Sequence, residues 1–173
     1  LTVVRQYHYT MEELMGEKEH PLFLVLEDLQ DPGNMGTIFR TAEGAGVDGI
    51  FMSANCVDIY NPKTIRSTMG SIYRVPFVIA PDLQEVFAWF KKQGICSYAA
   101  HLKGKGWYDE QSYAGGTAFL IGNEGNGLTD ATAGQADCLI RIPMKGQLES
   151  LNAGVAAAIL MYEASRQRRK EYK

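Results

Sequence analysis

Residues 119–128 have the sequence "FLIGNEGNGL", and the interpretation of the whole chain starts from this stretch. An apolar run breaks into glycines at positions 122, 125 and 127, with the carboxylate of Glu124 among them. A short apolar run is typical of a buried strand, and glycine adopts backbone conformations that other residues avoid. The stretch therefore predicts a strand that ends in a tight loop.

The glycine loop does not fit the common phosphate-binding motifs. A GxxxxGK[ST] loop needs a lysine that is missing here. A literal GxGxxG occurs at Gly44, Gly46 and Gly49, but it follows a helical pattern and precedes a strand, the reverse of the dinucleotide fingerprint. We interpret those glycines as a helix end and a turn. A lysine-free loop with one acid suits a nucleoside or a cation, and a plain turn stays an equal alternative.

Outward from this loop, apolar segments alternate with helical patterns along the chain. The expected strands are residues 21–29, 49–53, 76–80, 95–100, 117–122 and 138–143. The expected helices are 37–46, 61–71, 82–94 and a last one from about Ser150, with turn chemistry at 31–36. Apolar strands separated by helices predict an α/β fold, with a mostly parallel sheet and helices on both faces. One domain is expected from about Pro21 onward.

Composition excludes several classes of protein. The chain has 173 residues, of which 46% are hydrophobic and 21% charged, and its net charge of -3 gives no general attraction to nucleic acid. The 3 cysteines form no CxxC and the 3 histidines form no HExxH, so we expect no metal site and a reduced, cytoplasmic chain. The longest apolar stretch is too short to span a membrane, and no membrane contact is expected.

Two further stretches combine glycine and proline with polar and basic residues. Residues 31–40, "DPGNMGTIFR", place Arg40 one turn after Gly36, where it forms either an anion site near the helix start or a solvated surface position. Residues 140–154, "IRIPMKGQLESLNAG", place Ser150 and Asn152 at the expected entry to the last helix. Ser150 lacks the glycines of a GxSxG nucleophile turn, which argues against a serine hydrolase.

Together the three stretches resemble the SpoU (TrmH-like) family of RNA ribose 2′-O-methyltransferases, within the SPOUT superfamily. The resemblance covers about residues 21–168, and its motifs occur in the family's order. The motif NxGxxxR is met by Asn34, Gly36 and Arg40, the glycine-rich motif by Gly122, Glu124, Gly125 and Gly127, and IPMxGxxxSLN by Ile142, Pro143, Met144, Gly146, Ser150, Leu151 and Asn152. Ala153 and Gly154 depart from it, since bulkier or hydroxylic residues are expected there.

The resemblance implies a C-terminal deep trefoil knot, made by the second and third motif loops, that holds S-adenosylmethionine. The implied cofactor-binding residues are Ala100, Gly122, Asn123, Glu124, Ile142, Met144 and Leu151. The implied reaction is methyl transfer to a ribose 2′-hydroxyl. Arg40 is either its base or a clamp on the adjacent phosphate, because a free guanidinium does not normally lose its proton. Asn34 and Glu124 would orient Arg40 and the RNA, and Ser150 and Asn152 the motif loops and the ribose.

The resemblance also implies partners. It suggests a homodimer with the active site near its interface, and an RNA substrate, with rRNA favoured over tRNA because the chain has no long basic C-terminal extension. We expect residues 1–20 to be a linker from an N-terminal RNA-binding domain and residues 21–173 to be the catalytic domain. The one basic run, residues 166–170, is either an RNA contact or a solvated terminus. The alternative is a non-catalytic RNA-binding or regulatory protein with the same fold.

Overall fold

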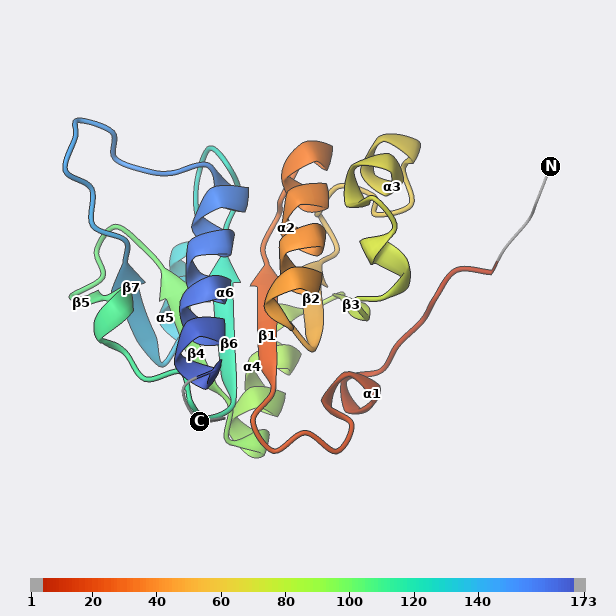
Figure 1. The fold of residues 1–173 in the computed structure, drawn as a ribbon, viewed down its shortest axis with the longest axis horizontal. Helices are drawn as coiled ribbons and strands as arrows, with labels where there is room; N and C mark the ends of the chain where they lie inside the picture. Colours follow the sequence, from red (N-terminus) through yellow and green to blue (C-terminus); the bar gives the residue numbers. More distant parts are fainter. Residues whose placement is uncertain (1–4, 170–173) are drawn as a thin grey trace.

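The computed structural model describes residues 5–169, and its centre is one seven-stranded sheet (Figure 1). The strand order is β3-β2-β1-β6-β4-β7-β5, and every neighbouring pair is parallel. The strands are β1 (Leu22–Leu26), β2 (Gly49–Ser53), β3 (Phe77–Ala80), β4 (Cys96–Ala100), β5 (Gly106–Trp107), β6 (Thr117–Ile121) and β7 (Cys138–Arg141). The helices are α1 (Met11–Met15), α2 (Pro32–Ala45), α3 (Pro62–Thr68), α4 (Leu83–Gln93), α5 (Asp130–Gln135) and α6 (Ala153–Arg169), with short 3-10 helices η1 (Ser71–Tyr73) and η2 (Tyr108–Glu110).

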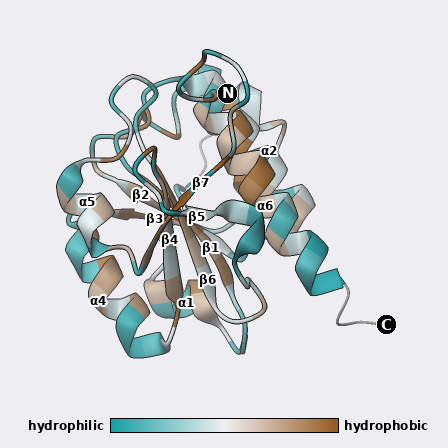
Figure 2. Ribbon diagram, turned by 90° about the vertical axis from the view of Figure 1, so that its left-hand side faces the viewer, coloured by the Kyte–Doolittle hydropathy of each residue, from teal (hydrophilic) through white to brown (hydrophobic). Residues whose placement is uncertain are grey.

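Helices cover both faces of this sheet, as the apolar strands predict. Figure 2 shows α2 and α6 on one side and α4 and α5 on the other. Strand β1 is buried along its whole length, and its side chains alternate between the two layers. Leu24 packs in the core under α2 and α6, whereas Phe23 and Val25 pack in the core under α4. The predicted α/β class and parallel sheet are confirmed.

Several predicted helix ends are confirmed by their hydrogen bonds. Asp82 caps the start of α4 through its side chain, and Gly94 ends that helix in the left-handed conformation. Gly46 ends α2 in the same way, which confirms that the GxGxxG match is a helix end followed by a turn. Thr10 and Glu13 form a capping box on α1. Leu14 of that helix is fully buried against Gly49, so the segment before Pro21 packs on the domain.

Two helix boundaries were predicted wrongly. The predicted turn at 31–36 belongs to α2, because Asp31 caps the helix and Pro32 occupies its first turn. The last helix begins at Ala153, not near Ser150, because the Asn152 side chain accepts the N–H groups of Gly154 and Val155. The short elements β5 and α5 were missed. Each has six residues or fewer and too little periodicity to be recognised.

The order of the strands changes direction at β1. From β1 the chain moves outward to β2 and β3, and it then returns to the other side of β1 to form β4 and β6. The loops after β1 and β6 are therefore neighbours at the carboxyl edge, where ligands bind in open α/β sheets. The predicted knot stays a prediction. Among residues 5–169 no helix is long and apolar enough to cross a membrane.

Candidate active site

Three loops at the carboxyl edge of the sheet enclose a cavity of about 440 Å³. They follow β4, β6 and β7, and the first turns of α6 close the cavity from the fourth side. This volume lies within the range of about 300–1,000 Å³ that is usual for small-molecule sites. The residues predicted from the resemblance to bind cofactor all line it: Ala100, Gly122, Asn123, Glu124, Ile142, Met144 and Leu151.

The glycine loop after β6 is folded tightly back on itself. Asn123 and Gly127 exchange main-chain hydrogen bonds of 3.1 and 2.9 Å. The Asn123 side chain accepts the N–H groups of Gly125 and Asn126, and its amide donates to the carbonyl of Asp28 after β1. A Cβ at Gly122 would lie 2.1 Å from the carbonyl carbon of Gly127. Gly122 is therefore required for the loop to close, and Asn123 acts mainly on the shape of the loop.

A polar network joins the three motif stretches. The Glu124 carboxylate accepts the main-chain N–H groups of Gln30 at 3.1 Å and Asp31 at 2.9 Å, and the side-chain amide of Asn34 at 3.1 Å. The Asn34 carbonyl oxygen in turn accepts the side-chain amide of Asn152 at 2.8 Å. Asn152 also caps α6. The network therefore fixes the entries of α2 and α6 to the glycine loop.

The hydrogen bonds to Glu124 keep its carboxyl group ionised. Partial burial raises the pKa of Glu124, but the bonds from the N–H groups of Asp31 and Gln30 and from Asn34 favour the charged form. Together they outweigh burial and lower the pKa of this carboxyl below its ordinary value. The site therefore carries a fixed negative charge at neutral pH.

A second carboxylate, which follows β1, bonds to the residues that follow the glycine loop. Glu27 follows β1 and accepts the N–H and the hydroxyl of Thr129, both at 2.8 Å, and the hydroxyl of Thr132. Those threonines begin α5, which follows the glycine loop. Glu27 thus holds the start of α5, while Glu124 holds the residues that lead into α2. Glu27 is buried and Glu124 is exposed.

Ser150 lines both this cavity and a second, more open hollow beside it, and Asn152 lines the second hollow. Asp31, Asn34 and Glu124 line the same hollow. Within the described part of the chain the Ser150 hydroxyl makes no hydrogen bond, and the residue is exposed, so it is available to a ligand. The predicted residues Asn34, Glu124, Ser150 and Asn152 are therefore brought together here.

Arg40 is not part of this group. Because α2 begins at Pro32, Arg40 lies two turns inside the helix rather than at its mouth, which corrects the sequence-based placement. Its side chain is exposed and lines neither hollow. Among residues 5–169 it has no hydrogen-bond or ion-pair partner.

Some residues of the cavity wall were not predicted. His101, Leu102 and Lys103 line it after β4, and Arg141 lines it at the end of β7. The Arg141 guanidinium lies 3.9 Å from the centre of the Trp107 ring, which holds it by a cation–π contact. The sequence signal for Arg141 was only its position next to the third motif. Its partner Trp107 lies in β5, which was not recognised. The described residues contain no cluster of three potential metal ligands.

Comparison with known proteins places the chain in a family. Residues 21–162 match the SpoU rRNA Methylase family, and the chain belongs to it. The chain is 38% identical, over 80% of its length, to the 23S rRNA (guanosine(2553)-2′-O)-methyltransferase RlmP of Bacillus subtilis, and covers 56% of that protein. It is 34% identical, over 92% of its length, to the tRNA (guanosine(18)-2′-O)-methyltransferase of Thermus thermophilus, of which it covers 82%.

A solved structure is similar over most of the chain. The SpoU methyltransferase AviRb from Streptomyces viridochromogenes, in complex with the cofactor AdoMet, matches with a TM-score of 0.83 at 34% identity. The match covers 88% of this chain and 59% of that one. The chain spans little more than half the length of several curated relatives that it matches.

Proposed function

We propose that this chain is the catalytic domain of an S-adenosylmethionine-dependent RNA ribose 2′-O-methyltransferase. The observation that carries the proposal is the network from Asn34 through Glu124 to Asn152, because it joins the three family motifs beside one cavity. The relatives named as 23S rRNA and tRNA 2′-O-methyltransferases support the same reaction.

The cavity has the properties that S-adenosylmethionine needs. Ile142, Met144 and Leu151 offer apolar walls to an adenine ring, and the glycine loop offers main-chain groups without side chains in the way. Bound there, the cofactor would supply the electrophilic methyl group. The chain's own task would be to orient that group and the ribose.

The residues around the two hollows would position the RNA. Glu124 holds Asn34, and Asn34 holds Asn152, so both amides are fixed before substrate arrives. The free Ser150 hydroxyl would bind the ribose or an adjacent phosphate. Preorganised polar groups of this kind lower the barrier because they need no rearrangement during the reaction.

We propose that Arg40 acts through a homodimer. Arg40 lies away from the cavity of its own chain, so it would face the cavity of a second copy. Two apolar side chains on α6, Val155 and Tyr162, are 47% and 50% exposed and would be covered by that copy. Light scattering should then give a mass near twice the 19.2 kDa of this chain, and a monomer at micromolar concentration would contradict the dimer.

The reaction is tested by binding and transfer together. Calorimetry with S-adenosylmethionine, S-adenosylhomocysteine and NAD should show binding of the first two only. Tritiated methyl transfer should then be measured with unmodified 23S rRNA, our first candidate, and with unmodified tRNA. Binding without transfer to either RNA would favour the non-catalytic alternative.

Arg40→Ala separates the role of Arg40 from cofactor binding. We expect the affinity for S-adenosylhomocysteine to stay within a few-fold. Methyl transfer should fall by roughly a hundredfold or more, the scale of losing one acid–base or charge-stabilising group. Arg40→Lys should restore little, because lysine lacks the planar fork. Near-normal transfer by Arg40→Ala would make Arg40 a surface residue.

A further inference from the structure

Two arginines of the C-terminal basic run, Arg166 and Arg168, form hydrogen bonds or ion pairs within the chain. The Arg168 guanidinium donates to the carbonyl oxygens of His20, Pro21, Tyr113 and Gly115. Arg166 forms a two-point ion pair with Glu163. Lys170 lies outside the described residues. Of the described part of the run only Arg169 is exposed without a partner, so in a chain with a net charge of -3 other basic side chains are candidates for further phosphate contacts.

The second basic surface lies on α3 and η1. Lys63, Arg66, Met69 and Tyr73 follow one another at intervals of three or four residues and are all exposed, and we call them the α3 surface. Within residues 5–169 neither Lys63 nor Arg66 has an acidic partner. Met69 and Tyr73 are 70% and 56% exposed, which makes them two of the large apolar side chains that the fold leaves open to solvent.

The α3 surface is fixed rigidly to the entry of α2. The Ser67 hydroxyl donates to the carbonyl of Pro32 at 2.7 Å, and a Cβ on Gly36 would overlap with Ser67. Farther along, the Glu43 carboxylate accepts bonds from Ser71 and Arg74. Pro32 is two residues before Asn34, so α3 is anchored one helical turn from the polar network.

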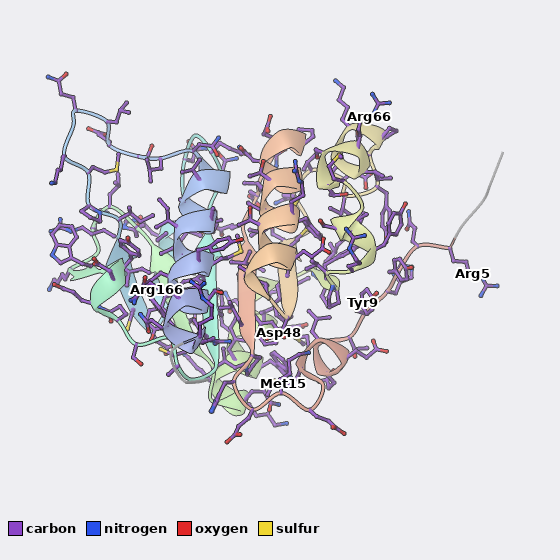
Figure 3. The ribbon with its side chains drawn as sticks, in the orientation of Figure 1. Arg5, Tyr9, Met15, Asp48, Arg66 and Arg166 are labelled. Atoms are coloured by element: carbon purple, nitrogen blue, oxygen red, sulfur yellow. The ribbon has the colours of Figure 1, made fainter. Side chains whose placement is uncertain are left out.

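Arg40 lies on the same side of α2 as this surface. Gly36, Arg40 and Glu43 are spaced by four and three residues, so they share one helical face. Gly36 and Glu43 contact α3 and η1, which places Arg40 beside them. Figure 1 shows α3 next to α2, and Figure 3 shows Arg66 projecting at the edge of the sheet where the motif loops lie.

We propose that the α3 surface binds the single-stranded RNA that flanks the target nucleotide. Lys63 and Arg66 contact two of its phosphates, and Met69 and Tyr73 form a platform on which an unpaired base stacks. Unstacked bases on apolar and aromatic side chains, with cations along the backbone, are the usual arrangement for single-stranded RNA. The proposal rests on the RNA methyltransferase activity proposed above.

The α3 surface fits RNA better than an acidic protein segment for two reasons. Its helix packs against the face of α2 that carries Arg40, which is expected to meet the ribose or its phosphate. Met69, which is 70% exposed and has a left-handed backbone (φ 51°) that is rare for methionine, and Tyr73, which is 56% exposed, offer an unpaired base apolar and aromatic surface on which to stack.

The test compares two double charge reversals in the full protein. Lys63→Glu/Arg66→Glu removes the proposed contacts, and Lys91→Glu/Lys92→Glu makes the same change in charge on α4, on the opposite face of the sheet. The probe is a fluorescein-labelled 20-nucleotide poly(U), measured by anisotropy at several salt concentrations. Calorimetry with S-adenosylhomocysteine checks that the cavity is intact.

We expect Lys63→Glu/Arg66→Glu to weaken poly(U) binding by tenfold or more near 0.1 M salt. The slope of log K against log salt should fall by about 1.4, the value for two lost contacts to a single strand. The α4 control should keep the slope of the unchanged protein. Equal losses in both variants, or no loss in the α3 variant, would overturn the proposal.

Two single variants test the stacking platform. Met69→Gly removes the side chain and relieves the left-handed backbone, so it should weaken poly(U) binding several-fold without lowering the melting temperature. Tyr73→Ala should weaken it to a similar extent. A loss of dimer mass in either variant would show that the surface joins two copies and would overturn the proposal. Failure to bind S-adenosylhomocysteine in the unchanged protein would instead contradict the proposed function.

Discussion

Two glutamates at the same edge of the sheet differ in what their hydrogen bonds accomplish. Glu27 after β1 binds the start of α5, and Glu124 after β6 binds the residues that lead into α2, so each loop holds the helix that follows the other. Glu27 is 7% exposed, and its side chain accepts hydrogen bonds from Thr129 and Thr132, which both belong to one helix start. Glu124 is exposed, lines the cavity and holds Asn34.

The difference shows how one bonding pattern serves both stability and a site. A buried, fully bonded carboxylate strengthens the fold, because removing it leaves polar groups without partners. An exposed carboxylate adds less to stability, since water competes for its bonds. Its value lies in the fixed orientation of the neighbouring amides. Variants of the two regions should therefore separate stability from activity.

The largest loss of cofactor binding is expected from a substitution that disrupts the loop that carries Glu124. Gly122→Val should abolish binding of S-adenosylhomocysteine, because its Cβ would overlap with the main chain at Gly127 and force the loop open. Calorimetry measures the loss. The control Gly134→Ala, on α5, has open space for a methyl group and should bind normally while gaining about 0.5–1 kcal/mol of stability. Unchanged affinity in Gly122→Val would place the pocket elsewhere.

Glu124→Gln tests whether Glu124 serves activity more than stability. One carboxylate oxygen becomes an NH2 group that cannot accept, so the bonds from Gln30, Asp31 and Asn34 cannot all be kept and the hold on Asn34 weakens. We expect methyl transfer to fall by about a hundredfold, the effect of misplacing reacting groups by roughly 1 Å. The free energy of unfolding should change by less than about 1 kcal/mol. The exposed carboxylate Glu110, changed to Gln, is the control, and equal transfer rates in the two variants would contradict the role of Glu124.

Glu27→Gln tests whether Glu27 serves stability more than activity. It should lower the free energy of unfolding by about 2 kcal/mol, because a buried amide would face donors at Thr129 and Thr132. Urea unfolding followed by circular dichroism measures the change. Methyl transfer at a temperature where the variant is folded should stay within a few-fold of the unchanged protein. A large loss of transfer with unchanged stability would reverse the assignment of the two glutamates.

The smallest expected effect is a dependence on pH that belongs to Glu124. Because the folded state lowers its pKa, the charged carboxylate stabilises the fold above the ordinary glutamate pKa of about 4.3. That contribution is lost as the pH falls through the lower pKa of the folded state. The difference in melting temperature between the unchanged protein and Glu124→Gln should therefore shrink from pH 7 to pH 3. A constant difference would show that charge plays no part.

Much of the architecture could be predicted from the sequence. The six longer strands, the parallel sheet and the caps at Asp82 and Gly94 depend on patterns within one or two turns of chain. The residues around the cavity were predicted through the resemblance of three motifs to a known family, since their pattern alone left a plain turn as an equal alternative. The boundaries of α2 and α6 were not, since turn residues at Asp31 and Asn152 also serve as helix caps.

The amino-acid sequence was sufficient to predict which segments form strands, that both faces of the sheet are covered, and which family the motifs resemble. Such features follow from local side-chain preferences and hydrophobic periodicity. The folded structure was needed to show that Glu27 and Glu124 each bind the entry of the helix that follows the other's loop. It also shows that Asn34 meets Asn152, and that Arg40 lies on the face of α2 next to α3 and not at the cavity. These contacts join residues about a hundred positions apart, so they depend on the strand order, which no local pattern specifies.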